Sequence, residues 1–241
     1  MLSLVVPAYN EGEHIFSNLM TIASVLSGAG FDYEIIPVND GSSDNTDEEI
    51  QRAATENARI KPVSYSDNRG KGGAIKAGVE VSGGDIIGFL DADLDISPDH
   101  IPVYMKTMES TGTDVVIGSK MHDESKLEYP LARKVFSWCY YIMLKVLFGL
   151  KTRDTQTGIK FYRGDLIKRI VPKLKVKGYA FDIEILALAA RMGAGITEMP
   201  VTVNYTREQS FGRIRVGDII RMFTDTITLW WNMRIRKLYD R

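Results

Sequence analysis

Residues 85–100, DIIGFLDADLDISPDH, join an apolar run to three carboxylates at every second position. Side chains alternate between the two faces of a β-strand, so an extended conformation would place Asp91, Asp93 and Asp95 on one face. Three like charges on one face repel one another and require a cation nearby. We expect a divalent ion such as Mg²⁺ or Mn²⁺ there, because carboxylate oxygens are the hard ligands that these ions prefer.

Two other interpretations of this stretch compete with a metal site. A calcium loop of the EF-hand type begins in the same way, but it needs Gly at its sixth position and Glu at its twelfth, where this chain has Ile96 and Pro102. A solvated acidic turn before a helix needs only Ser97 or Asp95 as the N-cap and Pro98 at the first helical position. The stretch alone excludes the calcium loop and leaves the capped turn open.

Apolar and amphipathic runs alternate through the first half of the chain. Strand, helix and strand repeated in this way predict an α/β fold with a mostly parallel, Rossmann-like sheet and helices on both faces. The expected strands are residues 2–8, 33–39, 61–66, 85–91 and 113–119, and the expected helices are residues 13–26, 44–57, 72–82 and 98–110.

Three polar clusters follow expected strands: PAYNEGE (7–13), VNDGSSDNTD (38–47) and DADLD (91–95). Ligands of such sheets bind at the carboxyl ends of the strands. Each cluster alone is explained by a turn into a helix, for example by a capping box with Thr46 as N-cap and Glu49 at N3. Together they place Glu11 and Asp40 at one edge with the three aspartates, which favours a nucleotide and its metal.

Glycine patterns narrow the class of nucleotide site. The dinucleotide fingerprint G-x-G-x-x-G is missing after the first expected strand, which argues against an NAD-dependent enzyme. The stretch NRGKGGA (68–74) is rich in glycine but lacks the spacing of a P-loop, so it is weak support for phosphate binding.

Composition indicates an ordinary globular chain of 241 residues, 44% of them hydrophobic, long enough for one large α/β domain. The single cysteine, Cys139, excludes an intramolecular disulfide and a cysteine-based zinc site, which favours a reducing compartment. The first residues lack a basic segment and are interrupted at Pro7, so they predict a buried strand and not a signal peptide. We therefore expect the protein on the cytosolic side.

The net charge of −1 conceals two halves of opposite charge. Residues 1–120 hold 8 basic and 19 acidic side chains, a net −11, and the remainder holds 22 basic and 12 acidic ones, a net +10. A basic second half suggests an anionic partner, such as nucleic acid, a phosphorylated lipid or a membrane surface. The acidic first half would repel the phosphates of a nucleic acid, so nucleic acid is the least favoured of these partners.

Two segments of the second half are suited to a membrane surface. The apolar run 135–150 is shorter than the roughly 20 residues that span a bilayer, and it combines aromatic side chains with flanking Lys and Arg. The segment 214–241 carries Trp230 and Trp231 followed by basic residues. The alternatives are a buried core helix for the first segment and an amphipathic helix of a homodimer for the second.

Seven stretches in order carry a resemblance over almost the whole chain: VVPAYNE, VNDGSSDNT, NRGKGGA, FLDADLD, DTQTGIKFYR, AFDIEIL and VTVNYTREQS. The sequence resembles the family-2 inverting glycosyltransferases of the GT-A fold, and within them the polyprenyl-phosphate hexosyltransferases that make dolichyl-phosphate glucose or dolichyl-phosphate mannose. RDTQTGIKFYR, YAFDIEIL and NRGKGGA are nearer to the glucose branch. The resemblance implies a GT-A catalytic domain at 1–212 and a C-terminal amphipathic helical tail at 213–241. Within the domain, it implies a nucleotide-sugar half at 1–120 and an acceptor half at 121–212 that contains an amphipathic helix at about 131–150.

The resemblance also implies roles for individual residues. It assigns the nucleotide to Pro7, Tyr9, Glu11, Asp40, Lys71 and Asp91, and the metal, Mg²⁺ or Mn²⁺, to Asp91, Asp93 and Asp95. It assigns catalysis to Asp93 and to Asp182, the latter as an orienting group for sugar or acceptor. It assigns the acceptor phosphate to Lys120, Arg133, Ser137, Arg207 and Ser210. Lys120 stands where Arg is more common, and an ammonium is a point charge that lacks bidentate geometry.

The implied reaction is attack of a lipid phosphate oxygen on the anomeric carbon, which expels a nucleoside diphosphate and gives a β-linked product. A phosphate monoester has a second pKa near ~6, so the acceptor is largely dianionic at neutral pH and hardly needs a general base. UDP-glucose is the favoured donor, and GDP-mannose, UDP-N-acetylglucosamine and UDP-glucuronate are alternatives. The expected location is the cytoplasmic face of a membrane, as a peripheral protein. A protein of another class, one that binds the membrane or polyprenyl phosphate without catalysis, remains open.

Overall fold

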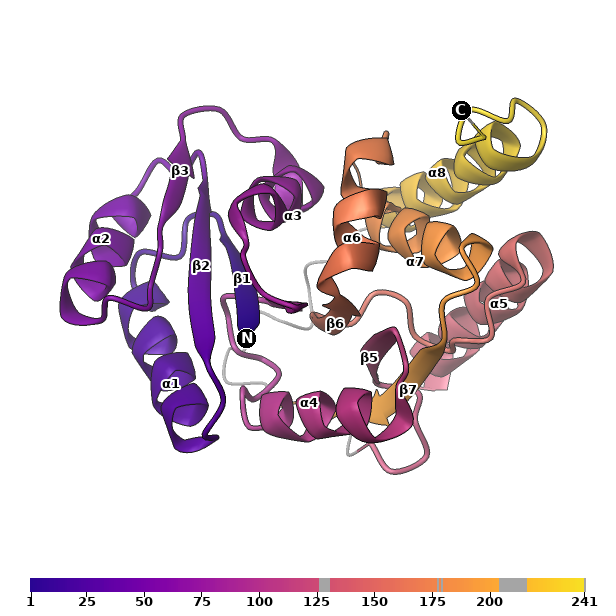
Figure 1. Ribbon diagram of the computed structural model, residues 1–241. Helices are drawn as coiled ribbons and strands as arrows, with labels where there is room; N and C mark the ends of the chain where they lie inside the picture. Colours follow the sequence, from indigo (N-terminus) through magenta and orange to yellow (C-terminus); the bar gives the residue numbers. More distant parts are fainter. Residues whose placement is uncertain (126–130, 177, 179, 204–215, 241) are drawn as a thin grey trace.

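The computed structural model describes residues 1–125, 131–176, 178, 180–203 and 216–240 (Figure 1). Within these residues one seven-stranded sheet runs through the molecule in the order β3-β2-β1-β4-β6-β5-β7. The strands are β1 (Leu2–Ala8), β2 (Tyr33–Asp40), β3 (Val63–Tyr65), β4 (Ile86–Leu90), β5 (Val115–Ser119), β6 (Ile159–Arg163) and β7 (Ile196–Pro200).

The sheet is parallel except for β6. Strand β1 pairs in parallel with β2 and β4, β2 with β3, and β5 with β7. Strand β6 lies antiparallel between β4 and β5. The prediction of a mostly parallel sheet is confirmed, and the five strands expected from the apolar runs are present.

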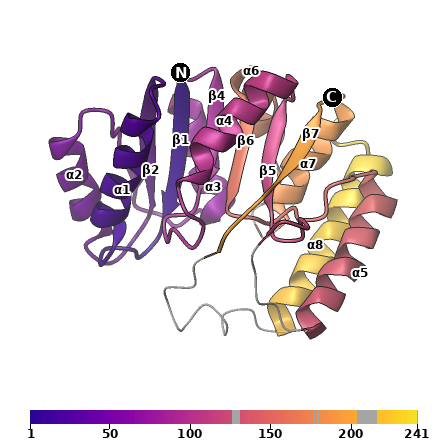
Figure 2. The same ribbon diagram turned by 90° about the horizontal axis from the view of Figure 1, so that it is seen from below.

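Helices cover both faces of the sheet (Figure 2). One face packs against α1 (Ile15–Gly28), α2 (Thr46–Glu56) and α4 (His100–Thr111). The other packs against α3 (Gly70–Val81), α6 (Gly164–Ile170), the 3₁₀ turn η1 (Val171–Lys173) and α7 (Phe181–Arg191). Two longer helices, α5 (Leu131–Phe148) and α8 (Val216–Arg234), complete the second half.

The alternation of side chains along β1 explains why both faces are covered. Leu4 and Val6 are buried in the core beneath α1 and α4, whereas Val5 is buried in the core beneath α3. A Cβ atom added to Gly78 would lie 2.4 Å from Val5 Cγ1, so the glycine lets α3 lie close to the sheet. Strands buried on both faces in this way are typical of parallel sheets.

Helices α5 and α8 lie side by side beyond the edge strand β7 (Figure 2). The hydroxyl of Tyr140 in α5 lies 2.8 Å from that of Thr226 in α8, and this pair is buried. The ring of Tyr140 also packs edge-on against Phe223 at 5.2 Å. No helix of the described residues is long and apolar enough to cross a membrane.

Candidate active site

The acidic motif forms a turn and not the extended strand that its alternating pattern predicted. Strand β4 ends at Leu90, and the N–H of Leu94 donates to the carbonyl of Asp91 at 3.4 Å. Leu94 has a φ of 53°, a left-handed conformation that reverses the chain. The extended geometry expected for Asp91, Asp93 and Asp95 is therefore wrong, although all three follow the carboxyl end of β4 as expected.

Two distant residues hold this turn in place. The N–H of Asp91 donates to the carbonyl of Gly158, just before β6, at 3.0 Å. A Cβ at Gly158 would lie 2.4 Å from Asp91 Oδ2, so only glycine lets the carboxylate occupy this position. From α1, the side chain of Asn18 donates to the carbonyl of Ala92 at 2.8 Å. The sequence reasoning did not single out Asn18 or Gly158.

The negative charge of Asp93 has an electrostatic cost in this turn. Burial raises the pKa of its carboxyl to about 6, and the negative charges of Asp91, Asp95 and Glu11 act in the same direction. The backbone N–H of Asp95 donates to Asp93 Oδ1 at 3.2 Å and offsets part of this cost. Glu11, which follows β1, thus lies within electrostatic range of the acidic motif.

Lys71 supplies a positive charge to the same edge. It lies in the first turn of α3, and its ammonium forms an ion pair with Asp91. Burial alone would lower the pKa of Lys71, but the carboxylates of Asp91, Asp182 and Asp93 hold it above its ordinary value. The structure therefore brings Lys71, which the sequence placed near the nucleotide, directly to the acidic motif.

The loops after β1 and β2 are bonded to each other. The N–H of Asn10 donates to Ser42 Oγ at 3.0 Å, and the N–H of Glu11 donates to Thr46 Oγ1 at 2.8 Å. Thr46 Oγ1 in turn donates to Asp44 Oδ1 at 2.5 Å. The proposed capping box is wrong, because Thr46 is the first residue of α2, the N-cap is Asn45, and the Thr46 hydroxyl serves the loop after β1.

The capped acidic turn also differs from its prediction. Helix α4 begins at His100 with Asp99 as N-cap, so neither Ser97 nor Asp95 is the N-cap and Pro98 lies before the helix. The hydroxyl of Ser97 donates to Asp99 Oδ2 at 2.8 Å.

Asp40, at the end of β2, is buried and fixed in orientation. Its Oδ1 accepts from the Tyr65 hydroxyl at 2.7 Å and from the Arg69 N–H at 2.8 Å. The next residue, Gly41, has a φ of 67°, and a Cβ there would lie 2.7 Å from the backbone nitrogen of Asn68. The loop before α3 therefore closes over the end of β2.

Tyr9 and Pro7 lie at the same edge. Tyr9 follows β1 with half of its surface exposed, which leaves its ring accessible to a ligand. Pro7 is the residue of β1 that pairs with Val38 of β2. The roles of both residues at the nucleotide remain predictions.

Asp182 forms a buried ion pair that the sequence reasoning did not anticipate. It lies in the first turn of α7, and its Oδ1 accepts from Lys160 Nζ at 2.7 Å. Lys160 is the second residue of β6 and also donates to the carbonyl of Thr157 at 2.7 Å. A lysine inside the apolar run IKFY was the signal in the sequence that could have pointed to this pair.

The residues expected at the acceptor phosphate are only partly described. Lys120 directly follows β5, and its N–H donates to Asp154 Oδ2 at 2.9 Å. Ser137 lies in α5 and is partly buried. Arg207, Ser210 and the side chain of Arg133 lie outside the described residues. An acceptor role for these five residues remains a prediction.

The acidic residues fit a divalent ion that is shared with a diphosphate. Within the described part of the chain, no three His, Cys, Asp or Glu side chains are grouped to hold a metal on their own. Mg²⁺ is usually bound through one or two carboxylates together with substrate phosphates and water. Asp93 is suited to this role, because its partial burial and the neighbouring carboxylates disfavour its negative charge, which a bound cation would stabilise.

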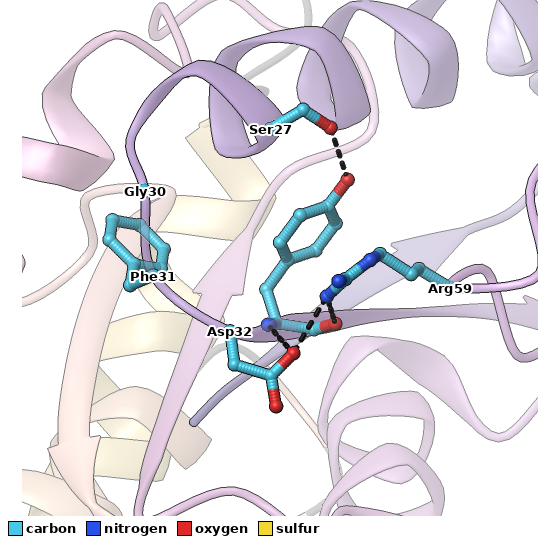
Figure 3. Close-up of a pocket in the computed structure, with 6 residues that line it drawn as sticks. Ser27, Gly30, Phe31, Asp32 and Arg59 are labelled. Atoms are coloured by element: carbon cyan, nitrogen blue, oxygen red, sulfur yellow. Dashed lines mark hydrogen bonds and ion pairs between the residues drawn. The ribbon is translucent and has the colours of Figure 1, made fainter.

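A hollow of about 370 Å³ lies elsewhere, where α1 leads into β2 (Figure 3). Its polar groups pair with one another. Arg59 Nη1 lies 2.7 Å from Asp32 Oδ1, and this contact lowers the pKa of Asp32. The hydroxyl of Tyr33 lies 2.7 Å from Ser27 Oγ. The hollow is at the amino end of β2, opposite the acidic motif, so we do not assign the reaction to it.

Known proteins resemble the chain in sequence and in structure. A dolichyl-phosphate beta-glucosyltransferase of Trichomonas vaginalis is 35% identical over 238 residues, which cover 95% of this chain and 72% of that protein. The dolichyl-phosphate beta-glucosyltransferase of Saccharomyces cerevisiae is 31% identical over 83% of this chain and 66% of its own length. An undecaprenyl-phosphate mannosyltransferase of Micrococcus luteus is 27% identical over 94% of this chain and 92% of its own length.

The solved structure of glucosyl-3-phosphoglycerate synthase from Mycobacterium tuberculosis, in a complex with Mn²⁺ and UDP, has the same fold. The TM-score is 0.71 at 20% identity, over 96% of this chain and 79% of that one. The model of the family described as "Glycosyl transferase family 2" matches residues 3–171, which run from the second residue of β1 to beyond β6 and include the acidic motif. The chain belongs to glycosyl transferase family 2.

Proposed function

We propose that the chain transfers a hexose, with glucose from UDP-glucose as the favoured donor, to a polyprenyl phosphate such as dolichyl phosphate. The observation that carries this proposal is the acidic turn at the carboxyl edge, where Asp93 is partly buried beside other carboxylates and Lys71 pairs with Asp91. Such a site binds a nucleoside diphosphate together with a cation. The named activities of the relatives from Trichomonas vaginalis and Saccharomyces cerevisiae support glucose as the sugar and dolichyl phosphate as the acceptor.

The donor half of the reaction uses the loops after β1, β2 and β4. Tyr9 is exposed at this edge and Asp40 is held by Tyr65 and Arg69, so both are suited to orient a nucleoside. Asp91 and Asp93 would hold Mg²⁺ or Mn²⁺, with Asp95 as a third oxygen ligand. A bound divalent ion stabilises the charge that develops on the leaving diphosphate. The Mn²⁺ and UDP in the mycobacterial complex support a divalent ion and a uridine nucleotide as the ligands.

The acceptor half uses the basic side of the chain. Lys120 directly follows β5. Strand β5 pairs antiparallel with β6, which begins directly after Gly158. A positive charge there suits a phosphate dianion, which attacks the anomeric carbon from the face opposite the leaving diphosphate. The product is then β-linked if the donor is α-linked. The phosphate is already deprotonated at neutral pH, so the reaction requires little general-base assistance.

The proposed acceptor is a lipid, and α5 and α8 each carry exposed apolar side chains that suit a membrane surface. Trp138, Ile142 and Val146 of α5 follow one another at four-residue spacing and are 58%, 38% and 77% exposed. In α8 and the segment after it, Ile227, Trp231 and Ile235 repeat the same spacing and are 53%, 49% and 52% exposed.

Residues four apart share one helix face, so each segment carries an exposed apolar stripe. Basic residues accompany both stripes, as expected for interfacial helices at anionic lipids. They are Lys145, Arg234, Arg236 and Lys237. We place the protein on the cytoplasmic face of a membrane, and the alternative occupant of the same face is a second copy of the chain in a homodimer.

Transfer of radiolabelled sugar to a short polyprenyl phosphate in detergent tests the proposed function. UDP-glucose, GDP-mannose and UDP-N-acetylglucosamine are offered in parallel with Mg²⁺ or Mn²⁺. We expect labelled lipid from UDP-glucose, and thermal stabilisation by UDP but not by GDP. Label from another donor would keep the mechanism and change the sugar. Bound nucleotide without labelled lipid from any donor would contradict the acceptor.

A further inference from the structure

The ion pair between Lys160 and Asp182 is almost completely enclosed. The side chains of Lys160 and Asp182 are 3% and 8% exposed, and Nζ lies 2.7 Å from Oδ1. Removing two charges from water costs more than a well-packed apolar pair would, so a buried ion pair contributes little net stability. The strand gains nothing obvious from a lysine between Ile159 and Phe161, which are both fully buried.

The position of Lys160 in the sheet connects it to the site. In β6 it pairs with Phe89 of β4 and with Ile117 of β5. Strand β4 leads directly into Asp91, and β5 leads directly into Lys120. Lys160 thus lies between the strand that ends in the donor motif and the strand that ends in the expected acceptor cation.

Asp182 connects the buried pair to the acidic motif. Its carboxylate is among those whose negative charge acts on Lys71, and Lys71 is paired with Asp91. The four groups therefore alternate in charge, from Lys160 through Asp182 and Lys71 to Asp91. Helix α3 and helix α7 contact each other here, because a Cβ at Gly72 would lie 3.2 Å from the ring of Phe181.

We propose that Lys160 is a positioning residue that fixes the Asp182 carboxylate by occupying its Oδ1, so that its second oxygen orients the hydroxyl groups of the donor sugar. This inference rests on the proposed function and assigns a role to a residue outside the motifs that bind nucleotide and metal. Lys160 is buried and its ammonium donates to Asp182 and to the carbonyl of Thr157, so it acts on the substrate through Asp182 and not by contact.

The test compares Lys160→Met, Lys160→Arg, Asp182→Asn and the double variant Lys160→Met/Asp182→Asn in the full chain. Thermal unfolding, UDP-induced stabilisation with Mn²⁺, and kcat and KM for UDP-glucose are measured for each variant. We expect Asp182→Asn and Lys160→Met to lower kcat at least 100-fold while UDP-induced stabilisation remains. Lys160→Arg keeps the charge and is expected to recover at least a tenth of the wild-type kcat.

The double variant separates positioning from a purely structural role. Lys160→Met leaves a buried carboxylate without its partner and can unfold the protein, whereas the double variant removes both charges and avoids this penalty. We expect the double variant to be as stable as the wild type and as inactive as Asp182→Asn, because residues that act as a unit are not additive. A stable double variant with at least half of the wild-type kcat would overturn the inference.

Two further outcomes are informative. A folded Lys160→Met protein with wild-type kcat would overturn the inference but leave the proposed function intact. Absence of lipid transfer by the wild type would overturn the proposed acceptor instead. Release of UDP from UDP-glucose is therefore measured in every sample, so that the Lys160 variants are compared whichever acceptor the enzyme uses.

Discussion

Lys71 and Asp91 form an ion pair that joins the first turn of α3 to the residue directly after β4. This ion pair does not neutralise the whole acidic motif, since the pKa of the neighbouring Asp93 is still raised to about 6. The pair also gives Asp91 a cationic partner within the protein. The site is thus arranged so that added positive charge is required mainly at Asp93.

The raised pKa of Asp93 predicts that the negative charge of this carboxylate destabilises the folded protein at neutral pH. A carboxyl whose pKa in the folded state, about 6, exceeds its ordinary value of 3.8 favours folding while it is protonated, and this contribution is lost as the pH rises through 6. In EDTA, Asp93→Asn should therefore be more stable than the wild type at pH 7.5, by about 1–2 kcal/mol. The difference should shrink toward pH 5. Urea unfolding at the two pH values measures it, and a pH-independent difference would contradict the assignment.

Gly158 makes room for the Asp91 carboxylate, so a methyl group there should disturb the site. A Cβ would lie 2.4 Å from Asp91 Oδ2. We expect Gly158→Ala to reduce kcat/KM for the nucleotide-sugar at least tenfold, because the displaced carboxylate misaligns the donor. The matched control is Gly28→Ala near the end of α1, where a Cβ meets nothing within 4 Å. Equal activity of both variants would show that the position of Asp91 is not critical.

The exposed face of α5 and α8 predicts binding to anionic vesicles. Trp138→Glu combined with Trp231→Glu places charges in both apolar stripes and should reduce sedimentation with vesicles of phosphatidylcholine and phosphatidylglycerol at least tenfold. The control is Val103→Glu, which alters a side chain that is 50% exposed on α4.

The same variants distinguish the membrane from a homodimer. A wild-type protein that remains off the vesicles and elutes as a dimer, with the double variant monomeric, would assign this face to a second copy of the chain. Wild-type sedimentation of the double variant would exclude the face as the site of lipid contact.

The segment after α8 is tied to α7 through a buried carboxylate. Glu184 accepts from the N–H groups of Lys175 and Val176 at 2.8 and 3.0 Å and from the Tyr239 hydroxyl. Burial raises the pKa of Glu184 despite these donors. Tyr239→Phe should lower the free energy of unfolding by about 1–3 kcal/mol, because it removes one donor to a buried charge. Tyr9→Phe, at an exposed ring, should change it by less than about 0.5 kcal/mol.

Local patterns in the sequence were sufficient for the first half of the fold. The alternation of apolar and amphipathic runs predicted β1 to β5 and the helices between them, because each element buries a periodic apolar face. The insertion of β6 antiparallel between β4 and β5 has no local signal, since it depends on pairing between Phe89 and Lys160, which lie far apart in the chain.

The sequence predicted the edge of the sheet at which the candidate site residues lie but not their contacts, and their chemical roles remain predictions. The clusters that contain Glu11, Asp40 and the acidic motif lie after β1, β2 and β4, at one edge of the sheet. The strand geometry of the motif was wrong because the left-handed conformation of Leu94 depends on the turn and on Asn18 of α1. The partner of Asp182 was missed because Lys160 lies 22 residues away.

The most direct test of the account is transfer of labelled glucose from UDP-glucose to a short polyprenyl phosphate by the wild type and by Asp93→Ala, with Mn²⁺ and with EDTA. We predict glucolipid only from the wild type with metal, and an Asp93→Ala protein that unfolds cooperatively and retains the fold. Glucolipid formation by a well-folded Asp93→Ala protein at the wild-type rate would contradict the claim that the acidic turn after β4 is the catalytic centre.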